Sequence, residues 1–198
     1  MEFIILIIVL LLILLSLAKI YDVKLKYLKE FAENEELKYN DIIKRYPSNI
    51  EVCKYILKML NNNNVKIEED KSANTCLYIA ITNKIIIANV KDSYTRIQTI
   101  AHECLHSIQD RKILLFNFIF SNIYLIFFTI SMILGIFKLI PNKMIFICLM
   151  LIFSYIYYFV RSYLENDAMI KAKYLAKEYM IDTKKASDDE INSIIRKL

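Results

Sequence analysis

The stretch Ala101-His-Glu-Cys-Leu-His-Ser-Ile-Gln109 contains both histidines of the 198-residue chain. On an α-helix, His102 and His106 would project from one face, one turn apart, where both imidazoles can bind the same metal ion. Glu103 follows the first histidine and can take a proton from a water molecule held there. The H-E-x-x-H pattern therefore predicts a zinc site on a helix, and the alternative is a solvated polar helix face that carries the pattern by chance.

The residues around this motif favour an amphipathic helix. Apolar side chains recur at 3.6-residue spacing, and the two histidines belong to the opposite, polar stripe together with Gln98 and Gln109. The members of the apolar face are Tyr94, Ile97, Ala101, Cys104, Leu105 and Ile108. The motif is therefore expected on a helix whose histidines point away from the core.

Three apolar blocks, 3–18, 113–137 and 144–160, place the chain in a membrane. The chain is 57% hydrophobic and its mean hydropathy is +0.36. The second block is long enough to cross a bilayer of about 30 Å, and the third is at the short end of the range. The second and third blocks are separated by a turn at Pro141-Asn142, which predicts a membrane hairpin. Two buried core helices are the alternative, but too little polar chain remains to surround them.

The first block is expected to be a retained membrane anchor, although a cleaved signal peptide is the alternative. No basic residue precedes it, and four lysines follow it (Lys19, Lys24, Lys26 and Lys29). Basic residues also flank the hairpin on one side, so the positive-inside rule places both polar segments in the cytoplasm. The expected organisation is an anchor (1–20), a cytoplasmic α+β segment with the motif helix (21–112), a transmembrane hairpin (113–160) and a C-terminal helical segment (161–198).

The region before the motif helix reads as a small α+β unit. Ser48 can cap a helix over Asn49–Leu60, and an asparagine tract can close that helix in the left-handed conformation. Three strands are expected, at Val65–Glu69, Cys76–Thr82 and Ile85–Val90, and they predict a small antiparallel sheet. The last strand can lie along a cleft and hold an extended peptide, or it can be an ordinary sheet strand.

Two histidines do not complete a catalytic zinc site, so a third ligand is needed. The hairpin returns the chain to the side of the membrane that carries the motif, directly before Glu165 and Asp167. These two carboxylates differ by about 200° on a helix, so only one can face the metal. Ala168 and Ala172 share the face of Glu165 and would allow close packing on the motif helix. Glu165 is therefore the predicted third ligand, and the alternative is a carboxylate extending to the membrane boundary.

The cysteines and the charge exclude other classes. Cys53, Cys76, Cys104 and Cys148 show no C-x-x-C spacing, so neither a disulfide framework nor a cysteine zinc site is expected, and a reducing compartment fits. The net charge is +5, and the basic residues are interspersed with acidic ones. They do not form the basic stripe that a nucleic-acid partner would need. The expected partners are the lipid bilayer and a peptide or protein substrate.

These features together resemble the YugP-like membrane zinc metallopeptidases of bacteria. The resemblance rests on the stretch from Ala101 to Gln109, the apolar hairpin, and the pattern Glu165-x-x-Ala168-x-x-x-Ala172, and it covers nearly the whole chain. It implies a zincin-type fold in the bacterial plasma membrane, one zinc per chain held by His102, His106 and Glu165, and Glu103 as the catalytic acid/base.

The sequence departs from this family at Leu105, where its members usually have glycine. The heat-shock membrane metalloproteases of the HtpX type share the order of the motifs but expect an acidic residue at the position of Met169. Intramembrane site-2-type proteases are disfavoured because the motif helix carries too many polar groups for a lipid-buried span.

The expected function is hydrolysis of membrane-proximal peptide bonds by a zinc-activated water. The alternative is an inactive membrane scaffold or partner-binding protein with a zincin-like shape.

Overall fold

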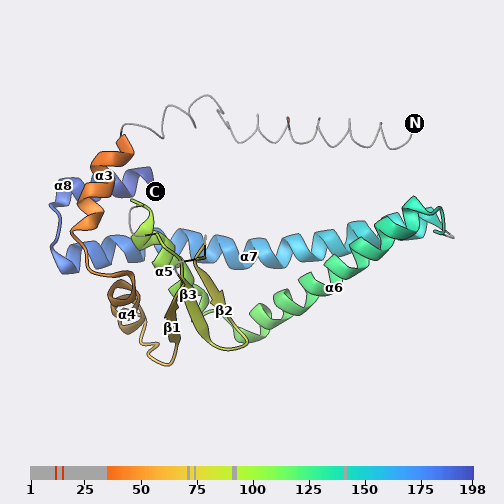
Figure 1. Ribbon diagram of the computed structural model, residues 1–198, viewed down its shortest axis with the longest axis horizontal. Helices are drawn as coiled ribbons and strands as arrows, with labels where there is room; N and C mark the ends of the chain where they lie inside the picture. The colour runs from red at the N-terminus through yellow and green to blue at the C-terminus, as the bar shows by residue number, and fades with distance from the viewer. Residues whose placement is uncertain are drawn as a thin grey trace.

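The computed structural model in Figure 1 describes residues 12, 15, 35–70, 72–73, 75–90, 93–140 and 142–198. Within these residues the chain is mostly helical with one small sheet. A compact α+β body lies at one end, and two long helices extend from it. The first expected span, 3–18, lies outside the described residues except for Leu12 and Leu15.

The α+β body begins with helices α3 (Glu35–Lys44) and α4 (Asn49–Met59). Ser48 and Glu51 form a capping box at the start of α4. Each side chain accepts a hydrogen bond from the backbone N–H of the other, which satisfies donors that the first turn leaves free. Asn61 follows the helix with a φ of 55°, the left-handed conformation that asparagine tolerates. The predicted helix and its ending are therefore confirmed.

The sheet consists of β1 (Lys66–Glu69), β2 (Leu77–Ile79) and β3 (Lys84–Ile87), in the order β1-β3-β2. Strands β2 and β3 form an antiparallel hairpin, but β1 pairs with β3 in parallel. The expected purely antiparallel sheet is therefore wrong, and the sheet is mixed. Because β3 contains the fully buried Ile85 and Ile87, it takes the central position. Strand β3, which precedes the motif helix, is thus an ordinary sheet strand with both edges paired. Strand β2 lies at an edge of the sheet.

The motif helix α5 (Arg96–His106) packs between α4 and the long helix α7 (Lys143–Thr183). Ile97, Ala101, Cys104 and Leu105 of its apolar face are buried as predicted, whereas Ile108, beyond the end of the helix, is exposed. On α7, Ala168 and Ala172 are fully buried, and these small side chains allow the two helix backbones to approach closely. Arg96 is also fully buried and donates hydrogen bonds to two carbonyl oxygens of the loop between α3 and α4. The expected contact between the alanine face and the motif helix is confirmed.

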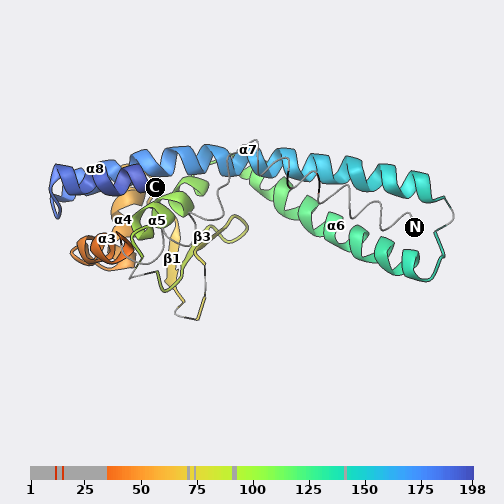
Figure 2. The same ribbon diagram turned by 90° about the horizontal axis from the view of Figure 1, so that it is seen from above.

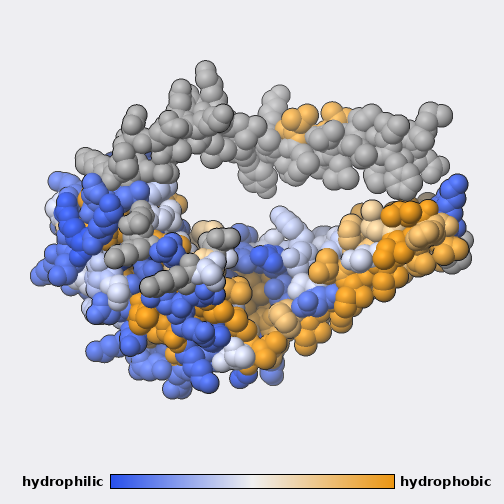
Figure 3. All heavy atoms as spheres, viewed as in Figure 1, coloured by the Kyte–Doolittle hydropathy of each residue, from blue (hydrophilic) through white to orange (hydrophobic). Residues whose placement is uncertain are grey.

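Helices α6 (Arg111–Ile136) and α7 form the expected hairpin, which Figure 2 shows from above. Of the helices that the structure describes, these two are long and apolar enough to cross a membrane, and the third expected span, 3–18, lies almost wholly outside the described residues. Their apolar stretches are not buried in the molecule, so they are not core helices, and α6 presents a continuous hydrophobic surface in Figure 3. Tyr124 and Tyr157 stack between them, and the Tyr124 hydroxyl lies 2.7 Å from Ser154 Oγ.

Helix α7 continues without a break from the hairpin into the α+β body, across the expected boundary at 160–161. Helix α8 (Asp188–Lys197) then folds back and buries Ile191 and Ile194. An ion pair of 3.1 Å between Arg45 and Glu190 joins it to the end of α3. One helix therefore connects the hairpin of candidate membrane spans directly to the core around α5.

The four cysteines are free thiols. Cys53, Cys76 and Cys104 are buried, as expected for small apolar residues, whereas Cys148 is exposed on the hairpin. The sulfur atoms of Cys53 and Cys104 lie 3.6 Å apart in the core between α4 and α5. These thiols pack the motif helix and are not part of the site described next.

Candidate metal centre

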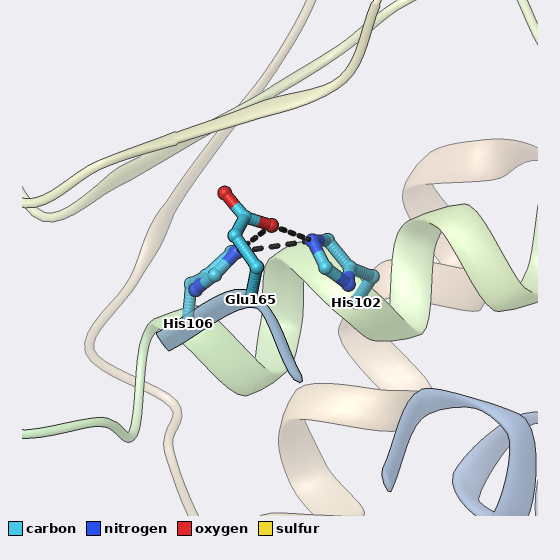
Figure 4. A group of neighbouring side chains, drawn as sticks. All are labelled: His102, His106 and Glu165. Atoms are coloured by element: carbon cyan, nitrogen blue, oxygen red, sulfur yellow. Dashed lines mark hydrogen bonds and ion pairs between the residues drawn. The ribbon is translucent and has the colours of Figure 1, made fainter. Parts of the chain in front are cut away.

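Helix α5 brings the two histidines together on the face that points away from the core (Figure 4). The Nε2 atoms of His102 and His106 are 3.0 Å apart, and the two rings are nearly perpendicular. Both side chains are only 15% and 12% exposed, respectively, so little water competes for them. The helix therefore presents two imidazole nitrogens to one point, as its i, i+4 spacing predicts.

Helix α7 adds Glu165 to this pair. Its Oε2 atom lies 3.2 Å from His102 Nε2 and 3.8 Å from His106 Nε2, and Figure 4 shows the three side chains converging. Asp167, the other carboxylate considered, points elsewhere and pairs with Lys171 at 2.5 Å. Glu165 lies about 60 residues after the histidines in the sequence. Its predicted approach to both of them is confirmed. Asp167 is not part of the group.

The spacing of these three side chains fits a metal ion. Nitrogen and oxygen ligands at about 2.0–2.2 Å from a tetrahedral ion lie about 3.3 Å from one another. The observed separations of 3.0, 3.2 and 3.8 Å are close to this value. One candidate ligand atom from each of His102, His106 and Glu165 can be chosen so that the three lie within 4.8 Å of one another. The group can therefore hold a metal ion with small adjustments of the side chains.

Gln109 orients one of the imidazoles. Its Oε1 atom lies 2.8 Å from His106 Nδ1, and its Nε2 donates hydrogen bonds to the carbonyl oxygen of Leu164 and to Asp167. Because the amide nitrogen is used as a donor toward α7, its oxygen accepts from His106 Nδ1–H, which leaves Nε2 free as a ligand. The sequence placed Gln109 on the polar stripe without this role, which its i+3 spacing from His106 could have indicated.

We expect the variant Gln109→Ala to bind metal about 10–100-fold more weakly, the usual effect of removing a group that orients a ligand. The change frees the His106 ring to rotate and to carry its proton on Nε2. Titration of the purified chain with Zn²⁺ against a competing chelator would measure the change. Gln98→Ala, on helix α5 itself, is the matched control and should leave the affinity unchanged; an equal loss in both variants would contradict the orienting role.

Glu103 occupies a different position from the three clustered side chains. It is 7% exposed, and its Oε2 accepts a 2.6 Å hydrogen bond from the backbone N–H of Tyr78 in the edge strand β2. Burial raises the pKa of the Glu103 carboxyl, although the imidazoles of His106 and His102 oppose this shift. The carboxylate is thus held between the sheet and the histidines, and no sequence pattern indicates its contact with β2.

The remaining charges link the centre to α7. Hydrogen bonds with His102 and His106 hold the pKa of the Glu165 carboxyl well below its usual range. Burial alone would lower the pKa of His106, but hydrogen bonds with Glu165 and Gln109 raise it above its ordinary value. Arg161, one turn before Glu165, approaches the other carboxylate oxygen at 3.5 Å. One oxygen of the Glu165 carboxylate therefore approaches the two imidazoles, and the other approaches the Arg161 guanidinium, a contact not expected from the sequence.

No family model matches the chain, and neither a curated protein nor a solved structure was found to match it. The geometry of this centre is therefore the basis for inferring a function.

Proposed function

We propose that this chain is a membrane-bound, zinc-dependent metallopeptidase. The observation that carries the proposal is the convergence of His102, His106 and Glu165, with the buried carboxylate of Glu103 directly beside them. Two imidazoles and one carboxylate are a ligand set of catalytic zinc sites, which keep one position open for the reaction. The order of motif, hairpin and glutamate supports placing the chain with the YugP-like metallopeptidases.

In this proposal the three side chains would hold the ion through His102 Nε2, His106 Nε2 and Glu165 Oε2. When bound, zinc supplies a Lewis acid that polarises the scissile carbonyl and makes water acidic enough to attack near neutral pH. Gln109 fixes the His106 ring, and Arg161 restrains the Glu165 carboxylate through its second oxygen. The surrounding protein thus keeps the ligands in place before substrate arrives.

Glu103 is the proposed acid/base. The Tyr78 N–H holds its Oε2, so Oε1 is the atom available to accept a proton from water and return it to the departing amine. Its raised pKa suits this task, because a group that takes and releases a proton works best when its pKa approaches the ambient pH. A peptide or protein substrate would bind beside β2, close to the membrane hairpin.

The test is metal analysis and peptide hydrolysis with the full chain purified in detergent. We expect one zinc per chain and hydrolysis of an unstructured protein substrate that stops on chelation and returns on addition of Zn²⁺. Removing the metal should leave the helical content unchanged, because the core around α5 is apolar. A chain that binds zinc but hydrolyses no peptide would be the alternative, an inactive scaffold or partner-binding protein.

The proposed location is the bacterial plasma membrane, with the centre on the cytoplasmic side. The hairpin tip carries two lysines, whereas Arg111, Lys112 and Arg161 lie at its base, and this excess predicts a cytoplasmic base. In a chain without native thiols, a single cysteine at Asn142 should react with an impermeant reagent added to intact cells. A cysteine at the exposed Lys185, before α8, should not react, and labelling there would place the centre outside.

A further inference from the structure

An apolar groove of about 510 Å³ lies at the base of the hairpin, between α6 and α7. Its volume falls within the range of about 300–1,000 Å³ that is usual for small-molecule sites. All but one of its lining residues are aliphatic or aromatic; they are Lys112, Ile113, Phe116, Phe159, Val160 and Tyr163. The groove thus lies where the two candidate spans meet the polar body.

This groove is separate from the metal centre. Tyr163 lines the groove, and Glu165 lies two residues later on α7, so the two side chains leave the helix about 200° apart. The groove therefore opens on a different side of α7 from the ligand cluster. A ligand bound in it would not meet the centre directly.

Lys112 is the one charged residue among those that line the groove. It lies in the first turn of α6, its side chain is exposed, and it has no ion pair within the part of the chain that the structure describes. Asp110 caps the helix by accepting from the Lys112 backbone N–H at 2.7 Å. Arg161, in contrast, is paired with Glu165. Lys112 is thus the cation that remains available to a ligand in the groove.

We propose that this groove binds one anionic phospholipid, with an acyl chain between Phe116 and Phe159 and its phosphate beside Lys112. Three observations favour this occupant: the lining is apolar, both walls are membrane-span candidates, and the one charged lining residue, Lys112, has no ion pair among the described residues. Lysines at a membrane surface attract anionic lipids, and basic pockets between membrane helices bind their headgroups. This site needs the hairpin in a bilayer and is independent of catalysis.

Tryptophan fluorescence can test this, because the chain contains no tryptophan. Phe116→Trp places a reporter in the groove, and Phe118→Trp places one on the exposed opposite side of α6. The full-length variants would be reconstituted in phosphatidylcholine vesicles with a small fraction of lipid brominated near the glycerol end of its chains. Brominated phosphatidylglycerol should quench the tryptophan at position 116 more than brominated phosphatidylcholine, with a local preference of about fivefold. At position 118 the two lipids should quench equally.

A second substitution assigns the preference to Lys112. Lys112→Gln should abolish the difference between the two lipids at position 116, whereas Lys143→Gln, at the other end of the hairpin, should preserve it. Equal quenching by both lipids at position 116, or a preference that survives Lys112→Gln, would overturn the proposal. Quenching at position 118 but not at 116 would also overturn it, because the groove would then be covered by another helix or a second copy.

Discussion

Replacing Glu103 with Gln should lower peptide hydrolysis by about 10²–10⁴-fold, the usual contribution of a general acid or base. The amide has nearly the same shape as the carboxylate, and its oxygen can still accept the hydrogen bond from Tyr78 N–H. Burial disfavours the charged form of Glu103, so the neutral amide fits the site without loss of stability. The measurements are kcat/KM for a peptide substrate and the zinc content of the same preparation.

The variant must keep its metal for this result to have meaning. Glutamine at position 103 leaves His102, His106 and Glu165 in place, so we expect the zinc content of the parent protein. Glu178→Gln, on the solvent-exposed side of α7, is the matched control and should retain full activity. Full hydrolytic activity in Glu103→Gln would show that another group moves the proton, and loss of the metal would show that Glu103 helps to bind it.

The parts of this fold that follow from neighbouring residues were predictable from the sequence. The capping box at Ser48 and Glu51 involves residues three apart, and the faces of α5 follow from helical periodicity. The hairpin follows from two long apolar blocks around one turn. The parallel pairing of β1 with β3 was not predictable, because it depends on β1 and β2 lying on opposite sides of β3, and short strands carry no signal for their partners.

The metal centre also has parts that could be predicted from the sequence and parts that could not. Glu165 could be identified because the alanines at i+3 and i+7 indicated the face of α7 that packs on α5. The contact of Tyr78 with Glu103 could not, because it depends on where an edge strand finally lies. The contact of Arg161 with Glu165 was missed, although their i,i+4 spacing on one helix could have indicated it. The ligands were therefore found because a spacing pattern in the sequence marks each of them. The contact of Tyr78, which has no such pattern, was missed.

Replacing Glu165 with Ala should weaken zinc binding by more than about 100-fold, beyond the 10–100-fold effect of losing a group that only orients a ligand. Its Oε2 is the third atom of the cluster, and the remaining two imidazoles of His102 and His106 do not complete a catalytic site. His106→Ala should have a similar effect. Asp167→Ala removes a nearby carboxylate outside the cluster and should retain nearly all of the affinity. Competition with a chelator at fixed pH measures all three variants.

The pH dependence separates a ligand from a merely electrostatic neighbour. Zinc binds neutral imidazole, so affinity falls as the pH drops through the pKa of His106. Hydrogen bonding to Glu165 raises that pKa, so Glu165→Ala should lower it and leave His106 less protonated in mild acid. If Glu165 acted only by favouring imidazolium, its removal would strengthen zinc binding below neutral pH. As a ligand, its removal must weaken binding at every pH, and stronger binding of the variant in mild acid would contradict the proposed centre.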